Sequence, residues 1–169
     1  MNIYILYCLY AKVEHLKDVL NSKYGINAYI PQIEEYSRFL HKNVIKPIYP
    51  NYLFIETNMN QEEFDVFLSS LHEDKSGVVK QLKKEDVSAL REVEKELFQK
   101  LFNKKHILEM SIGYIGEDGK VKIETGPLKE FEKDIVYINK RIRIAYLDLQ
   151  FLKKDIKAGL YIKNENKEI

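Results

Sequence analysis

The sequence predicts an α+β domain followed by a compact all-β domain. In the first part of the chain, short apolar runs alternate with segments whose apolar residues recur at helical spacing. After residues 103–110 the helical spacing stops, glycines become frequent, and short β-rich runs follow one another, which is typical of a small barrel. We therefore predict one domain at residues 1–105 and a second at residues 107–169.

The first domain begins with a strand and a helix. The run NIYILYCLY (2–10) is short, apolar and rich in β-forming residues, which predicts a buried strand. Apolar residues at helical spacing follow from Lys12, and Gly25 directly after Tyr24 is a natural C-terminal stop. The run INAYIP (26–31) predicts a second strand, which ends at its proline.

Further elements of this domain follow in order. The polar stretch 33–49 predicts a hairpin with residues 41–43 near its tip. Asn60 with Glu63 is a variant of the capping box and predicts the start of a second helix. The run GVVKQL (77–82) predicts a strand. A last stripe predicts a third helix that starts near Asp86 and includes Val87, Leu90, Leu97, Phe98 and Leu101.

The strand within PIYPNYLFIE (47–56) is apolar on both faces. Alternation places Tyr52 and Phe54 on one side, and Leu53 and Ile55 on the other. Helices on both sides of the sheet would explain this pattern. A tyrosine-rich docking surface for a protein partner would explain it equally, because aromatic side chains supply large contact areas with few rotors to order.

The second domain contains three β-rich runs, KVKIE (120–124), IVYI (135–138) and RIRIAYLDL (141–149). Alternation places several basic side chains together on the outside: Lys120, Lys122, Arg141 and Arg143, with Lys140 at the adjoining turn. Such rows could grip phosphate groups, or they could form the charged outer face that keeps a small barrel in solution.

The composition and the motifs exclude several classes of protein. The net charge of +1 gives no global basic field that would impose nucleic-acid binding. No apolar run approaches the length of a membrane span, so we expect a cytoplasmic protein. Nucleotide-binding glycine loops and hydrolase motifs are absent. We therefore expect a protein that is not an enzyme and has no catalytic residues.

The cysteine and the histidines indicate no metal or cofactor. Cys8, the single cysteine, lies within an apolar strand, where a buried and inert thiol is expected. The histidines are scattered without the spacing of metal ligands and are expected at the surface: His15, His41, His72 and His106.

The order of the N-terminal elements resembles a known family. The segments IYILYCLYAKVEHLKDVL, AYIPQIEEY and IKPIYPNYLFIE are similar to the N-terminal domain of NusG-type transcription elongation factors. Asn51, where the family commonly has glycine, and LYC at 6–8 resemble specialised, RfaH-like paralogues. The tryptophan usual near the family's first strand is replaced by Ile3. The resemblance implies an antiparallel sheet that carries helices.

In that family, an apolar face of this domain binds the clamp helices of the largest RNA polymerase subunit. The resemblance places Tyr7, Tyr52 and Phe54 at the aromatic contact positions, and Leu53 and Ile55 on the core face. It implies a monomer that suppresses pausing and termination by binding alone. An alternative of a different class is an RNA- or ribosome-associated module without polymerase contact.

The second half, GKVKIETGPLKEFEKDIVYINKRIRIAYLDL, resembles a KOW domain and is similar to that of LoaP-type antiterminators. The resemblance implies an SH3-like barrel that contacts structured leader RNA and recruits the factor to particular operons. Housekeeping relatives instead bind a ribosomal protein or a termination factor, and both kinds of partner stay open. The candidate RNA-binding residues are Lys120, Lys122, Lys129, Lys140, Arg141 and Arg143. The strong β propensity of VYINKRIRIAYL predicts strands here rather than a helical form that masks the docking face.

Overall fold

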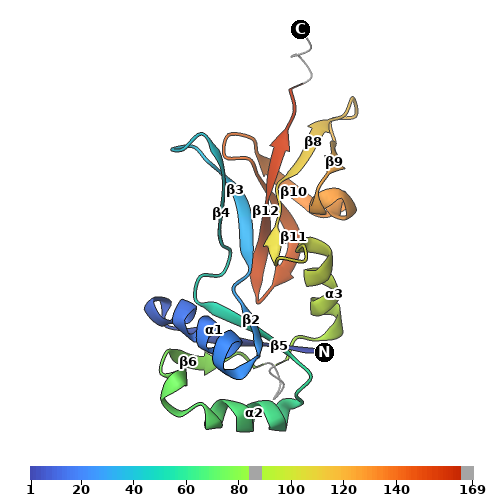
Figure 1. Ribbon diagram of the computed structural model, residues 1–169. Helices are drawn as coiled ribbons and strands as arrows, with labels where there is room; N and C mark the ends of the chain where they lie inside the picture. Colours follow the sequence, from blue (N-terminus) through green and yellow to red (C-terminus); the bar gives the residue numbers. More distant parts are fainter. Residues whose placement is uncertain (84–88, 165–169) are drawn as a thin grey trace. The chain divides into compact units, whose positions relative to one another are not determined.

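A computed structural model describes residues 1–83 and 89–164, which fold into two compact units (Figure 1). Unit 1 consists of Met1–Pro31 and Pro47–Glu96, and unit 2 consists of Gln32–Lys46 and Leu97–Ile169. The division does not follow the order of the chain, because the early segment Gln32–Lys46 belongs to unit 2. The domains at residues 1–105 and 107–169 are a division along the chain and stay a prediction.

Unit 1 is built on a four-stranded sheet in the order β2-β5-β1-β6, whose neighbours are all antiparallel. The two strands that are apolar on both faces, β1 and β5, lie in the middle of this sheet, which explains their composition. The elements of unit 1 are β1 (Asn2–Cys8), α1 (Tyr10–Tyr24), β2 (Asn27–Tyr29), β5 (Tyr52–Thr57), α2 (Gln61–Ser70), the 3-10 helix η1 (His72–Lys75) and β6 (Val78–Gln81).

The core of unit 1 lies between this sheet and the helices α1 and α2 (Figure 1). Leu53 and Ile55 are both 0 % exposed and belong to this core, so their predicted place on the helix-packed face is confirmed. The rings of Tyr4 on β1 and Phe64 on α2 are stacked, with centroids 3.9 Å apart. Burial of this apolar surface supplies most of the stability of such a small sheet.

The capping signals in the sequence mark the helix ends correctly. α1 begins at Tyr10 rather than at Lys12, and it ends as predicted before Gly25, whose φ of 63° is left-handed. Asn60 and Glu63 form the complete capping box of α2. The Asn60 side chain accepts the backbone N–H of Glu63 at 2.9 Å, and the Glu63 carboxylate accepts that of Asn60 at 2.8 Å.

The predicted start of the third helix is wrong. α3 (Glu92–Leu101) begins after Leu90. The backbone N–H of Leu90 donates to the carbonyl of Ile3 at 2.8 Å, so this residue is held in extended pairing beside β1. Tertiary pairing here overrides the helical spacing of the apolar residues. Asp86 and Val87 lie outside the described residues.

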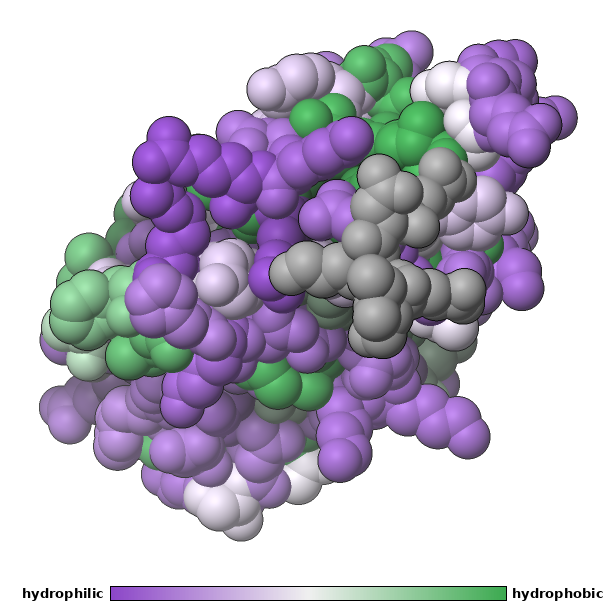
Figure 2. All heavy atoms as spheres, turned by 90° about the horizontal axis from the view of Figure 1, so that it is seen from above, coloured by the Kyte–Doolittle hydropathy of each residue, from purple (hydrophilic) through white to green (hydrophobic). Residues whose placement is uncertain are grey.

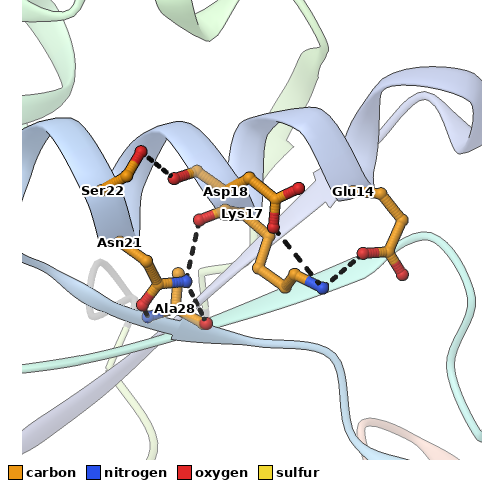
Figure 3. A network of polar contacts seen from close by, with 6 residues as sticks. All are labelled: Glu14, Lys17, Asp18, Asn21, Ser22 and Ala28. Atoms are coloured by element: carbon orange, nitrogen blue, oxygen red, sulfur yellow. Dashed lines mark hydrogen bonds and ion pairs between the residues drawn. The ribbon is translucent and has the colours of Figure 1, made fainter.

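The side chain of Asn21 joins α1 to β2 (Figure 3). Its Nδ2 donates to the carbonyls of Lys17 and Ala28, each at 2.8 Å, and its Oδ1 accepts the backbone N–H of Ala28 at 3.2 Å. The carboxamide therefore satisfies both backbone groups of Ala28, as a neighbouring strand would. The nearby pair of Lys17 and Glu14 lies on the exposed surface of the helix.

We expect Asn21→Ala to destabilise unit 1 by about 1–3 kcal/mol, because it leaves part-buried backbone groups of Ala28 without partners. Urea unfolding of the full chain measures the change. Ser22→Ala is the matched control on the same helix. It removes only an exposed hydroxyl that donates to the Asp18 carbonyl at 2.6 Å, so it should cost less than about 0.5 kcal/mol. Equal effects of the two changes would contradict the role given to Asn21.

Unit 2 contains a five-stranded sheet in the order β10-β11-β12-β8-β9 and a three-stranded sheet in the order β4-β3-β7. β12 pairs antiparallel with β11 and parallel with β8. Within the residues that the structure describes, β9 and β10 are the two edges and do not pair, so the expected closed barrel is not confirmed. The strands and the 3-10 helix of unit 2 are β3 (Gln32–Ser37), β4 (Lys42–Pro47), β7 (Ile107–Leu108), β8 (Ser111–Ile115), β9 (Val121–Thr125), η2 (Pro127–Asp134), β10 (Ile135–Asn139), β11 (Ile144–Phe151) and β12 (Lys154–Ile162).

The hairpin of β3 and β4 is held to the C-terminal part of unit 2 by backbone contacts. β3 pairs parallel with β7 and lies beside β12 (Figure 1). The carboxylate of Glu34 accepts the backbone N–H of Met110 at 2.8 Å. A Cβ atom at Gly159 would stand 2.6 Å from the Glu34 carbonyl oxygen, so only glycine permits this approach of β12 to β3.

Two local predictions in unit 2 are corrected. The predicted hairpin is present, but its turn lies at residues 38–41, so the tip overlaps the predicted residues 41–43 only at His41. It is also less polar than expected, because Phe39 is 91 % exposed there. The strand predicted at residues 141–149 begins only at Ile144. None of the helices in the described parts of the chain is long and apolar enough to cross a membrane.

Candidate functional site

An aromatic group lies on the face of the unit 1 sheet that points away from the helical core. Tyr7 on β1 is the register partner of Tyr52 on β5, and their rings meet edge to face with centroids 5.3 Å apart. The Tyr49 ring lies 6.1 Å from that of Tyr52, and burial raises the pKa of Tyr49 to about 12. Lys80 on β6 places its ammonium 6.0 Å from the Tyr7 ring. The pair of Tyr7 and Tyr52 is therefore a preformed aromatic surface with a cation at its edge.

The three predicted aromatic contact residues differ in exposure. Tyr7 and Tyr52 are half-buried, whereas Phe54 is 0 % exposed. The Phe54 ring lies 5.8 Å from that of Tyr29, and its backbone is the register partner of Ile5. Tyr7 and Tyr52 thus present surface, while Phe54 packs among the apolar residues of this face.

Asn51 fixes the strand ends that carry these tyrosines. Its Nδ2 donates to the Cys8 carbonyl at 3.0 Å, and its carbonyl accepts the Cys8 backbone N–H at 2.7 Å. The end of β1, where Tyr7 lies, is therefore tied to the start of β5. The sequence signal was the asparagine itself, since a glycine at this position would supply only the backbone bond.

The lone cysteine is buried, and three of the histidines have a left-handed backbone conformation. Cys8 is 0 % exposed, as predicted, and burial raises the pKa of its thiol to about 11, so it stays protonated at neutral pH. His41, His72 and His106 adopt left-handed φ values of 53°, 48° and 59°. Histidine tolerates that conformation better than most residues. Within residues 1–83 and 89–164, no group of histidine, cysteine or acidic side chains could hold a metal ion.

The basic candidates of unit 2 lie on three separate segments. Lys120 comes directly before β9, Lys122 lies on β9, and Lys129 lies on η2, all three exposed. The predicted alternation on β9 is confirmed, because Ile123 is buried beside exposed Lys122. The remaining candidates are Lys140, Arg141 and Arg143, in the turn between β10 and β11.

The predicted row of Arg141 and Arg143 along a strand is wrong, because both residues lie in a turn. The side chain of Asn139 accepts the backbone N–H of Arg141 at 3.2 Å and that of Ile142 at 3.3 Å, which holds the turn. Arg143 has a left-handed φ of 56° and ends this turn. Lys140 and Arg141 are exposed, so they are the members of this cluster that face solvent.

Arg143 lies over two tyrosine rings, a contact that the sequence did not indicate. Its guanidinium carbon lies 3.8 Å from the ring centroid of Tyr36 on β3 and 4.5 Å from that of Tyr161 on β12. Arg143 therefore joins the hairpin to β12.

Apolar side chains are dispersed over the face drawn in Figure 2. Figure 2 shows one face of the molecule on which hydrophilic side chains predominate and apolar side chains form separate patches (Figure 2). In unit 2, the most exposed apolar side chains include Phe39 at 91 %, Val136 at 66 % and Tyr137 at 59 %. These three residues were not among the predicted site residues, and strand alternation alone does not distinguish them from other outward positions.

The comparisons with known proteins concern mainly unit 1. The family model described as "Transcription termination factor nusG" matches residues 1–102. This range covers the sheet with Tyr7 and Tyr52 and also the hairpin of β3 and β4. A search of curated proteins finds no match to the chain.

Proposed function

Because the chain belongs to the NusG family, we propose that it is a transcription elongation and antitermination factor that acts by binding RNA polymerase. Family membership indicates a role in transcription elongation or termination, and factors of this family interact with RNA polymerase. The family consists of non-enzymatic transcription factors. The observation that carries the proposal is the match over residues 1–102, which contain the preformed pair of Tyr7 and Tyr52.

The surface proposed for RNA polymerase is the tyrosine face of the unit 1 sheet. Tyr7 and Tyr52 present aromatic surface held at a fixed geometry, and such anchors lose little side-chain entropy on binding. A pair of helices, such as the clamp helices of the largest subunit, can lie on an apolar sheet face in this way. Phe54 supports this surface from within, because its own side chain has no exposed area.

The proposed action is a shift of populations. A factor that binds the closed, elongating form of the polymerase more tightly than the paused form raises the fraction of the closed form. The size of this shift is set by the difference between the two affinities. Pausing and termination then decrease. No reaction step on the factor itself is required. The cytoplasmic location and the monomeric state stay predictions.

The proposed role of the C-terminal part is recruitment by structured leader RNA, as in LoaP-type antiterminators with a KOW domain. Lys140 and Arg141 support this role, because both are exposed in one turn. A-form RNA is recognised mainly through its backbone and its shape, for which basic side chains on a rigid sheet are suited. The other candidates on this part are Lys120, Lys122, Lys129 and Arg143. A ribosomal protein or a termination factor is the competing partner for the same part.

We expect the double change Tyr7→Ala and Tyr52→Ala to weaken binding of the purified chain to core RNA polymerase by at least tenfold. The reason is the loss of both partly exposed anchors, each of which can contribute more than about 1 kcal/mol at an interface. Binding is measured by titration of the labelled chain with polymerase. Tyr10→Ala is the matched control, since Tyr10 is a tyrosine of the same unit and 72 % exposed.

The melting temperature of each variant shows whether a loss of binding reflects unfolding. Unchanged polymerase binding in a folded double variant would contradict the assigned face. If the unaltered chain bound RNA but not polymerase, the alternative of an RNA- or ribosome-associated module would replace the proposal.

A further inference from the structure

The open sheet of unit 2 has a groove between its two edge strands. The groove has a volume of about 660 Å³ and lies between the end of the β8–β9 hairpin, the last turn of η2 and β10. Sites that take small ligands usually have volumes of roughly 300–1,000 Å³. This groove is therefore large enough for one or two nucleotides.

The rim of the groove is basic. Lys120, Lys122 and Lys133 line it, and the side chains of all three are exposed. In the part of the chain that the structure describes, none of these three lysines forms an ion pair. The carboxylate that lines the groove, Glu132, is already engaged, because it accepts the backbone N–H of Ile123 at 2.7 Å. With three lysines against one carboxylate among its lining residues, the groove carries a net positive charge.

One wall of the groove is apolar and aromatic. Tyr137 and Val136 on β10 line it while 59 % and 66 % exposed. The Tyr137 ring lies 5.6 Å from that of Tyr146 on β11, which restricts its orientation. An exposed aromatic ring beside exposed lysines is the combination by which proteins bind single-stranded nucleic acid, with bases on the ring and phosphates on the cations.

We propose that this groove binds unpaired nucleotides of a nucleic-acid chain, with a base against Tyr137 and its flanking phosphates at Lys120, Lys122 and Lys133. The inference rests on the RNA contact proposed above and adds a site for the unpaired part of that RNA. It adds Lys133 and Tyr137 to the candidate RNA-binding residues and gives Lys120 and Lys122 a common ligand. The excess of positive charge favours a phosphate chain over a peptide strand at these edges.

The test uses the full chain, because β3 belongs to unit 2 and a fragment from residue 107 onward would lack it. The probe is a fluorescein-labelled 12-nucleotide RNA without secondary structure, titrated by anisotropy over a salt series. The same sequence as DNA and an RNA hairpin of equal length serve as comparison ligands. The single-stranded RNA can bind more tightly than the DNA of the same sequence, or the two can bind equally. Either result supports the groove, and the comparison shows which kind of chain the groove selects.

Tyr137→Leu should weaken binding of the single strand about tenfold without changing its salt dependence, since it removes the stacking ring and keeps an apolar side chain. The triple change of Lys120, Lys122 and Lys133 to Gln should reduce the slope of log affinity against log salt by roughly 0.7 for each lysine. Lys104→Gln is the control, because Lys104 is an exposed lysine of unit 2 outside the groove. It should change the affinity for the single strand and the salt slope no more than the loss of one distant charge does.

Three outcomes overturn the inference in distinguishable ways. If Lys140→Gln with Arg141→Gln abolishes RNA binding while the groove variants bind normally, the groove is wrong and the turn remains the RNA contact. If the unaltered chain binds neither RNA nor DNA, both RNA assignments fail. Polymerase binding through Tyr7 and Tyr52 is measured separately and is unaffected by either result. Binding of the hairpin alone, insensitive to Tyr137→Leu, also contradicts the groove.

Discussion

Phe64→Ala should destabilise unit 1 by about 3–5 kcal/mol, the usual cost of truncating a fully buried phenylalanine. Phe64 is 0 % exposed, and its ring stacks on Tyr4 with an angle of 7° between the planes. The Tyr4 hydroxyl donates to the Met59 carbonyl at 2.8 Å, so Tyr4 is not free to move into the space that the lost ring leaves. The loss is a large part of the 5–15 kcal/mol by which most domains are stable.

The measurement is urea unfolding of the full chain followed by circular dichroism. Val66→Ala on the same helix is the control, since Val66 is 70 % exposed and its change should stay within about 0.5 kcal/mol. Polymerase binding should fall only in proportion to the unfolded fraction, because the helices lie on the opposite face from Tyr7 and Tyr52. A loss below about 1 kcal/mol would mean that the core of unit 1 is not organised around this stacked pair.

Gly126→Ala should destabilise unit 2 by roughly 3 kcal/mol or more. Gly126 has φ 101° and ψ 175°, a region of the backbone map that is nearly restricted to glycine and costs other residues about 1–3 kcal/mol. A Cβ atom there would also stand 2.6 Å from the Cα and 2.5 Å from the Oγ of Ser111. Ser111 is 0 % exposed and accepts the backbone N–H of Leu128 at 3.0 Å, so it cannot move away without losing that bond.

Gly119→Ala separates backbone strain from the steric overlap. Gly119 has φ 75° but no heavy atom within 4 Å of an added Cβ, so we expect only the conformational cost of about 1–2 kcal/mol. Both variants are compared by thermal and urea unfolding. A Gly126→Ala protein no less stable than the Gly119→Ala protein would show that η2 can shift away from Ser111 at little cost. In that case η2 would not fix the position of Lys133 in the groove.

The sequence predicted the elements of unit 1 well, because their signals are local. Gly25 stops α1, the Asn60 and Glu63 box starts α2, and the two-sided apolar pattern of β1 and β5 matches central strands. The start of α3 was missed because pairing of Leu90 with β1 is a tertiary contact that helical spacing does not reveal. Periodicity assigned Phe54 to the correct face, but it could not show that Phe54 is buried while Tyr52 is half-exposed.

The candidate sites of unit 2 were predicted less completely, because their geometry depends on residues far apart in sequence. Asn139 holds the turn that removes Arg141 from a strand, and a side-chain cap of this kind competes with strand propensity. Tyr36 comes from the early hairpin, so its stack on Arg143 has no local signal. Lys133 and Tyr137 become neighbours of Lys120 only through the position of η2 between two edge strands.

The membership of Gln32–Lys46 in unit 2 affects the order in which the two units can form during synthesis. All residues of unit 1 have left the ribosome once Glu96 has emerged, so this unit can form early. The hairpin emerges with it, but its partners β7 and β12 have not yet emerged. At a synthesis rate of about 5–20 residues per second, the hairpin remains without the last of these partners for a time on the order of ten seconds. During that time the edge of β3 that later pairs with β7 is open, and Phe39 is exposed at the hairpin turn. A chaperone, or another nascent chain, could pair with this edge first.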